Sequence, residues 1–266
     1  MTIAAGFRCK DGVVLAADTE ISVLGGTGKS YSSKMFEINS GLGSHLTYSG
    51  SPDFTKELVQ ELKQSVAGKP QQSALQALKE TYRDYYDAQL PDSDRDTTSM
   101  LITLREGKKV HLYVARNRHF APVRQYEALG IGSEQGEALF NPLHSQWMST
   151  AEAKYMAIYA LRRVKGFVQG CGGKTEVIEI GDKADVLSLY EVMQEIKEIE
   201  ADFDFFDQQL RPILFTFSDL WVNKSAFQAR LRQFGRALKK RRAASVRAYE
   251  KDMAEWAKIV RESKEG

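Results

Sequence analysis

Two short apolar runs separated by a polar turn open the chain. The runs are "TIAAGFRC" at 2–9 and "VVLAAD" at 13–18, and the "KDG" between them contains the Asp-Gly pair typical of hairpin turns. After a loop rich in Gly and Ser at 25–33, short strands are expected around "KMFEI" (34–38) and "SHLTYSG" (44–50). The pattern therefore predicts mostly antiparallel β-structure before residue 51.

The spacing of the apolar positions then changes to that of helices. Two sets recur every three or four residues: Phe54, Leu58, Leu62 and Val66, then Leu75, Leu78, Tyr82 and Tyr85. A polar loop, "PDSDRD" at 91–96, precedes a second predicted hairpin over 98–115 that turns at "REGKK". Together these segments predict two helices followed by two paired strands.

The next segments complete the predicted domain. Residues 126–140 lead from a strand into a glycine-rich turn, 149–164 predict a helix with a Ser/Thr cap, and 174–180 predict a closing strand. The order is β-β, α-α, β-β, α, β. It favours an α+β fold, a sandwich with sheets at its centre and helices outside.

Beyond the closing strand the sequence is long, charged and helix-forming. Residues 189–210 are acidic, and residues 229–247, "ARLRQFGRALKKRRAASVR", are basic. An apolar stripe marks the basic segment: Phe227, Leu231, Phe234 and Leu238. We therefore expect two parts, a domain over 1–187 and a helical C-terminal extension over 188–266.

The basic segment has three interpretations. In the first, it is a solvated helix face. In the second, it docks on the acidic segment 195–207 of the same or a neighbouring chain. In the third, it binds phosphate backbones, with an affinity that falls steeply as salt increases. The apolar stripe needs an apolar partner, so the second interpretation is favoured.

Overall composition narrows the function classes. The 37 Lys and Arg residues nearly balance 35 Asp and Glu, which argues against nucleic acid as a partner. Cys9 and Cys171 do not have metal-ligand spacing and are expected to be free thiols in a reducing cytoplasm. No apolar run has the length of a signal or membrane segment, so we expect a cytoplasmic protein that does not contact membranes. The four histidines also lack ligand spacing, and we expect neither metal nor cofactor.

Three polar residues stand at the edges of the predicted N-terminal strands. Thr2 opens the first strand, Asp18 ends the second, and Lys34 stands in "SSKMFEI" before the third. Each has an ordinary explanation by itself. Thr2 can be a chance residue, Asp18 a turn former at the end of a strand, and Lys34 a solvated charge. Their joint spacing within a matching order of strands is far more specific.

On these landmarks, residues 2–180 resemble the β subunits of the proteasome core particle and, more broadly, the N-terminal-nucleophile (Ntn) hydrolases. The resemblance implies an αββα sandwich of two antiparallel sheets between helix layers, with Thr2 as nucleophile beside Asp18 and Lys34. It places the oxyanion-hole N–H on Gly50 in "YSGSPD". The assisting serine corresponds to Ser133 in one alignment of "GIGSEQG" and is replaced by Ile131 in another. Val168 and Cys171 replace the Asp and Ser of the family's "DxxSGG" turn, so that part of the site departs from the pattern.

The chemistry explains why a threonine must be N-terminal. A threonine hydroxyl needs a base, and a free α-amine has a pKa of about 7.7–8.0, whereas an amide nitrogen cannot accept the proton. Met1 must therefore be removed. Lys34 stays charged beside Asp18 and depresses the pKa of the amine, and the Gly50 N–H stabilises the oxyanion. The expected reaction is amide hydrolysis through an acyl-enzyme ester on Thr2.

The resemblance also implies partners and rival functions. The family's subunits assemble into rings, so a homo-oligomeric ring or barrel acting on peptide or protein substrates is expected, with an ATPase or other activator as a further partner of such particles. One alternative is a catalytically silent assembly subunit that keeps Met1. Another is an amidase of the same fold acting on small molecules.

Overall fold

The computed structural model describes residues 2–22, 28–89, 98–182, 189–214 and 224–265. They fall into two units, Met1–Ile196 and Lys197–Gly266. The predicted loop at 91–96 and the predicted domain boundary between 187 and 188 lie outside the described residues. That boundary therefore stays a prediction.

The first unit contains both sheets. Its strands are β1 (Ala4–Cys9), β2 (Gly12–Asp18), β3 (Glu20–Ser22), β4 (Lys29–Tyr31), β5 (Met35–Asn39), β6 (Ser44–Ser49), β7 (Ser99–Glu106), β8 (Lys109–Arg116), β9 (His119–Pro122), β10 (Tyr126–Leu129) and β11 (Thr175–Gly181). The helices of the chain are α1 (Pro52–Val66), α2 (Gln71–Gln89), α4 (Ser133–Phe140), α5 (Thr150–Phe167), α6 (Leu189–Leu214) and α7 (Lys224–Glu265).

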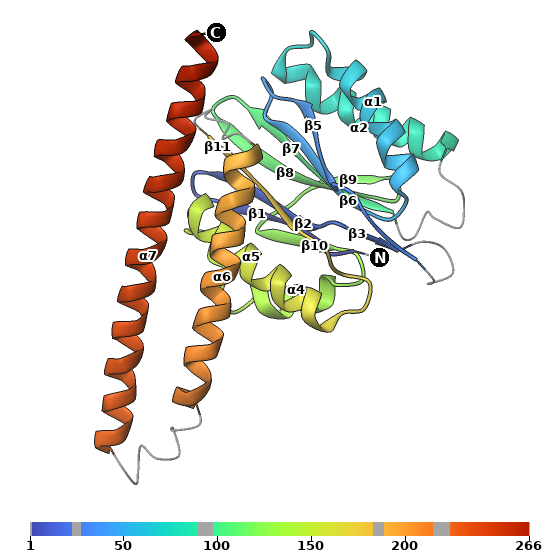
Figure 1. The fold of residues 1–266 in the computed structure, drawn as a ribbon. Coiled ribbons are helices and arrows are strands. Elements are labelled where there is room, and N and C mark those ends of the chain that lie inside the picture. The colour runs from blue at the N-terminus through green and yellow to red at the C-terminus, as the bar shows by residue number, and fades with distance from the viewer. Residues whose placement is uncertain (1, 23–27, 90–97, 183–188, 215–223, 266) are drawn as a thin grey trace. The chain divides into compact units, whose positions relative to one another are not determined.

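Two antiparallel sheets lie face to face. One has the strand order β10-β1-β2-β11 and the other β5-β6-β7-β8-β9, while β3 and β4 form a separate short ribbon. Helices α1 and α2 pack on the five-stranded sheet, and α5 packs on β2 and β11 of the four-stranded sheet (Figure 1). The predicted αββα sandwich is confirmed.

Buried strands and a close contact at Gly6 explain how the two sheets pack against each other. All seven residues of β2 are buried, because this strand has neighbours on both edges and layers on both faces. Gly6 in β1 lets the sheets approach closely, since a Cβ there would lie 2.9 Å from a methyl carbon of Leu112 in β8. The buried β1–β2 pair carries the residues that stand at its ends.

The helix starts follow the expected local chemistry. Ser149 and Glu152 form a complete capping box at the start of α5, as the Ser/Thr signal predicted. Pro52 stands in the first turn of α1, where its missing N–H costs no hydrogen bond.

Three features were missed in the sequence. The strand β3 precedes the Gly/Ser-rich segment and its partner β4 lies within it, β9 has only four residues, and α4 occupies part of the predicted glycine-rich turn. Short strands carry too few positions to show alternation. Helix α4 depends on a tertiary contact, the edge-on packing of Phe140 on Phe7 with ring centroids 4.8 Å apart.

The region predicted to be a helical extension contains two described helices, α6 and α7. Within Lys197–Gly266, Arg241 of α7 donates to Asp202 of α6 at 2.7 Å, and the rings of Phe206 and Phe234 lie 5.6 Å apart. The acidic and basic segments therefore contact each other within one chain, consistent with the docking interpretation. None of the described helices is both long and apolar enough to cross a membrane.

Candidate active site

The first two strands bring Thr2 and Asp18 together. Because β1 and β2 pair antiparallel with Ala4 opposite Ala17, the start of the first strand meets the end of the second. Asp18 Oδ1 accepts from the Thr2 hydroxyl at 2.6 Å and from the Ile3 N–H at 3.1 Å, and the Asp18 N–H donates to the Ile3 carbonyl at 3.1 Å. The carboxylate is thus fixed directly against the threonine hydroxyl.

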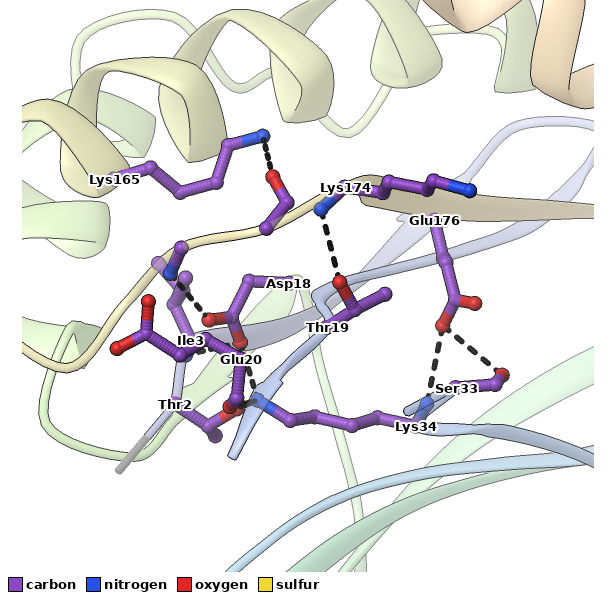
Figure 2. Close-up of polar contacts among 12 residues, drawn as sticks. Thr2, Ile3, Asp18, Thr19, Glu20, Ser33, Lys34, Lys165, Lys174 and Glu176 are labelled. Atoms are coloured by element: carbon purple, nitrogen blue, oxygen red, sulfur yellow. Dashed lines mark hydrogen bonds and ion pairs between the residues drawn. The ribbon is translucent and has the colours of Figure 1, made fainter. Parts of the chain in front are cut away.

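Lys34 reaches this pair from the segment just before β5, as Figure 2 shows. Its Nζ lies 2.6 Å from Asp18 Oδ1 and 2.6 Å from the Glu20 carbonyl oxygen, and it donates to the Thr2 hydroxyl. Thr2, Asp18 and Lys34 are each at most 2% exposed. The structure therefore assembles the three residues singled out in the sequence into one buried cluster.

The electrostatics of the cluster depend on its burial. Burial lowers the pKa of Lys34, and the adjacent Asp18 carboxylate opposes this by stabilising the ammonium. The second Asp18 oxygen, Oδ2, accepts the Gly172 N–H at 2.8 Å. Asp18 thus accepts hydrogen bonds on both oxygens, which fixes its orientation toward Lys34.

Two glycines that the sequence did not single out as site residues pack directly against Thr2. The Gly132 N–H donates to the Thr2 carbonyl at 3.1 Å. Gly130 has φ +87°, and a Cβ there would collide with the Thr2 carbonyl oxygen and lie 2.8 Å from Ser49 Oγ. The sequence "GIG" at 130–132 predicted a turn. Its contact with Thr2 could not be predicted locally, because it depends on the pairing of β10 with β1.

The positions of Ile131 and Ser133 follow from these contacts. Ile131, which lies between the two glycines, is 51% exposed. Ser133 begins α4, and in the described part of the chain no hydrogen bond joins its hydroxyl to Thr2. An assisting role for Ser133 stays a prediction.

Gly50 follows the last residue of β6 and has φ +111°. The preceding residue, Ser49, is buried and lies beside the Gly130–Thr2 contact. Gly50 therefore directly follows Ser49, which lies close to Thr2. Its role as the oxyanion donor stays a prediction.

The departures from the family pattern also lie at the site. Val168 is the C-cap residue that follows α5, and Cys171 is 4% exposed and immediately precedes Gly172. Burial and the nearby Asp18 raise the pKa of the Cys171 thiol to about 12, which keeps it neutral at physiological pH. Cys9 and Cys171 are both free thiols.

Two carboxylates near Lys34 were not identified from sequence. Glu20 is buried, and its Oε2 forms an ion pair of 3.0 Å with Lys29. Glu176, in β11, accepts the backbone N–H of Lys34 at 3.1 Å. Both stand in segments predicted as strand or loop, and nothing in their local pattern distinguishes them from solvated charges. No group of three metal-ligating side chains occurs among the described residues.

An open groove lies beside the glycine segment. It has a volume of about 490 Å³ and is lined by Ile131, Gln135, Phe167, Val168 and Gln169. The side chain of Phe167 is 75% exposed. The exposed apolar side chains of Ile131 and Phe167 are thus available to a molecule bound in this groove.

The fold can be compared with solved structures. An Anbu (Gly-1) mutant from Hyphomicrobium sp. strain MC1 matches with a TM-score of 0.63 and 14% identity, over 80% of this chain and 97% of that one. Anbu from Yersinia bercovieri, described as an ancestral beta-subunit, matches with a TM-score of 0.65 and 14% identity, over 79% of this chain and 97% of that one. This is a proteasome-like Ntn-hydrolase fold.

The similarity at this identity establishes the fold alone. The sequence matches no family profile and no curated protein. The proteasome-like fold covers nearly all of the two solved chains but leaves about a fifth of this one uncovered. This chain therefore carries additional sequence beyond the shared fold.

Proposed function

We propose that this chain is a threonine-type peptidase or amidohydrolase that cleaves amide bonds through an acyl-enzyme on Thr2 after removal of Met1. The observation that carries the proposal is the buried contact of Lys34 Nζ with both the Thr2 hydroxyl and Asp18. Such an arrangement places a cation at the one hydroxyl that must lose a proton. The proteasome-like fold supports the same chemistry by analogy.

Acylation begins with transfer of the Thr2 hydroxyl proton to the α-amine that Met1 removal frees. The Lys34 ammonium lowers the pKa of that amine by like-charge proximity and stabilises negative charge developing on the hydroxyl oxygen. Asp18 keeps Lys34 in place and charged. The attack on the substrate carbonyl then forms a tetrahedral intermediate whose oxyanion accepts the Gly50 N–H.

Collapse of the intermediate expels the amine product, which takes the proton from the α-amine. The acyl group remains as an ester on Thr2, and water then hydrolyses the ester to release the carboxylic acid. In this scheme Ser133 assists the amine.

The groove beside Gly130 favours peptides over small amides. It is open, and the exposed Ile131 and Phe167 offer apolar contacts to an extended chain. We place the protein in the cytoplasm as a homo-oligomeric particle, with an activator such as an ATPase to feed it substrate. The free thiols of Cys9 and Cys171 fit a reducing compartment.

Hydrolysis of fluorogenic peptide amides tests the proposal. Wild-type protein should release the fluorophore, Thr2→Ala should lose at least about a thousandfold in rate, and Thr2→Ser should retain part of it. Thr150→Ala is the matched control, because its N–H contacts Asp11 in the turn at the opposite end of the β1–β2 pair.

The same assay separates the alternatives. A protein that retains Met1 and hydrolyses nothing is a silent assembly subunit. Hydrolysis of small amides without hydrolysis of peptides identifies a small-molecule amidase of this fold.

A further inference from the structure

Glu176 links the two sheets through a hydrogen bond from the backbone N–H of Lys34. It stands in β11 of the four-stranded sheet, one residue after Thr175, which pairs with Asp18. Lys34 immediately precedes β5 of the five-stranded sheet. The catalytic candidates Asp18 and Lys34 thus come from different sheets, and Glu176 lies beside both.

The contacts of Glu176 are made with the backbone and side chain of one short segment. Its Oε2 accepts the Lys34 N–H at 3.1 Å and the Ser33 hydroxyl at 3.1 Å (Figure 2). The Ser33 hydroxyl in turn accepts the Met35 N–H at 3.2 Å. One carboxylate oxygen therefore fixes the backbone on which the Lys34 side chain is carried.

We propose that Glu176 is a positioning residue that holds the backbone of Lys34 so that its side chain stays against Thr2 and Asp18. The inference rests on the proposed function of Thr2 and assigns to Glu176 a role in the same reaction. It acts through Lys34 and does not touch the substrate.

The charges around Lys34 support this role. Its ammonium faces Asp18 of β2 and the Glu20 carbonyl of β3, while Cys171 and Glu176 also lie near it. Burial lowers the Lys34 pKa, and the Asp18 carboxylate, with a smaller effect from the Glu176 charge, raises it. Burial also raises the pKa of Glu176 itself, opposed by the hydrogen bonds from Lys34 and Ser33. Tyr48 stays neutral, because burial and the charges of Asp53, Glu176 and Asp18 raise its pKa to about 12.

The test measures how fast a peptide epoxyketone forms an adduct with the full-length protein, by intact mass, across a range of pH. Glu176→Ala removes both the acceptor and the charge, whereas Glu176→Gln keeps an acceptor oxygen and removes only the charge. Glu37→Gln is the control, since it removes an exposed carboxylate from β5, the strand that Lys34 precedes.

Glu176→Ala should lower the maximal inactivation rate at least about tenfold with an unchanged half-saturating concentration, as expected for loss of a charge-assisted hydrogen bond. Glu176→Gln should recover most of the rate at neutral pH. Its alkaline limb should move to lower pH, because Lys34 loses its proton more readily without the neighbouring charge. Glu37→Gln should match wild type.

The outcomes separate this inference from the proposed function. If the wild-type protein, freed of Met1, forms no adduct on Thr2, the proposed function fails and the inference fails with it. If wild type reacts and a folded Glu176→Ala keeps the wild-type rate, or Glu176→Gln keeps the wild-type pH profile, Glu176 does not serve Lys34 and the inference alone is overturned. Melting temperatures identify a variant that has lost its fold. If Glu176→Ala does not fold, the pH profile of Glu176→Gln, which keeps the side-chain size and an acceptor oxygen, tests the inference.

Discussion

Lys34 and Asp18 form a buried ion pair in which each charge depends on the other. The Lys34 side chain is 2% exposed and that of Asp18 is fully buried, so removal of one partner leaves an uncompensated charge. We predict that Lys34→Met lowers the free energy of unfolding by about 3–5 kcal/mol. Urea unfolding measures this loss.

The double variant provides the internal check on that prediction. Asp18→Asn combined with Lys34→Met removes both charges, so it should be less destabilised than the two single changes added together. Additive losses would contradict a direct pairing of the two residues.

Gly130 is required at its position by conformation and by space. Its φ of +87° disfavours other residues, and a Cβ would strike the Thr2 carbonyl. We expect Gly130→Ala to cost more than about 1 kcal/mol of unfolding free energy and to slow reaction at Thr2. Gly166→Ala is the matched control in helix α5, where a Cβ meets nothing within 4 Å and helix propensity favours alanine by up to about 1 kcal/mol. Equal effects of the two changes would rule out the contact.

At the scale of elements, Lys154 joins three parts of the first unit. This buried side chain of α5 pairs with Glu179 of β11 at 2.6 Å and Glu195 of α6 at 2.7 Å. Burial lowers the Lys154 pKa, but the two pairs outweigh it and raise the pKa above its ordinary value. The stabilisation is therefore present below pH 10.5 and is lost as the pH rises through the folded-state pKa.

Lys154→Met should therefore loosen the start of α6. We expect faster amide hydrogen exchange over residues 189–196 and a loss of about 3 kcal/mol of unfolding free energy. Lys56→Met, which breaks an exposed pair with Asp53 at 3.8 Å, should change stability by less than about 0.5 kcal/mol. Unchanged exchange at 189–196 in Lys154→Met would contradict the joining role.

The elements differ in how far sequence could predict them. Long periodic segments such as α1 and the β7–β8 pair were predicted, because their apolar spacing reports burial directly. Thr2, Asp18 and Lys34 were found because their spacing along the hairpin strands matches a known pattern. Gly130, Gly172 and Glu176 were not identified as site residues, because their contacts with Thr2, Asp18 and Lys34 span long separations in sequence and exist only in the folded sheets.

For the whole molecule, the proposed function requires assembly. We expect light scattering after size exclusion to give a mass several times that of the 29.9 kDa chain. The large apolar side chain of Trp147, which is 72% exposed, suits a contact between copies. A monomer at micromolar concentration would contradict the predicted ring or barrel.

The central claim is that Thr2 becomes an N-terminal nucleophile, and intact-mass spectrometry tests it most directly. Purified protein is weighed before and after incubation with a peptide epoxyketone, which requires both a free α-amine and the threonine hydroxyl. We predict loss of Met1 and a single adduct that Thr2→Ala abolishes. Retained Met1 with no adduct, or an adduct that persists in Thr2→Ala, would contradict the account.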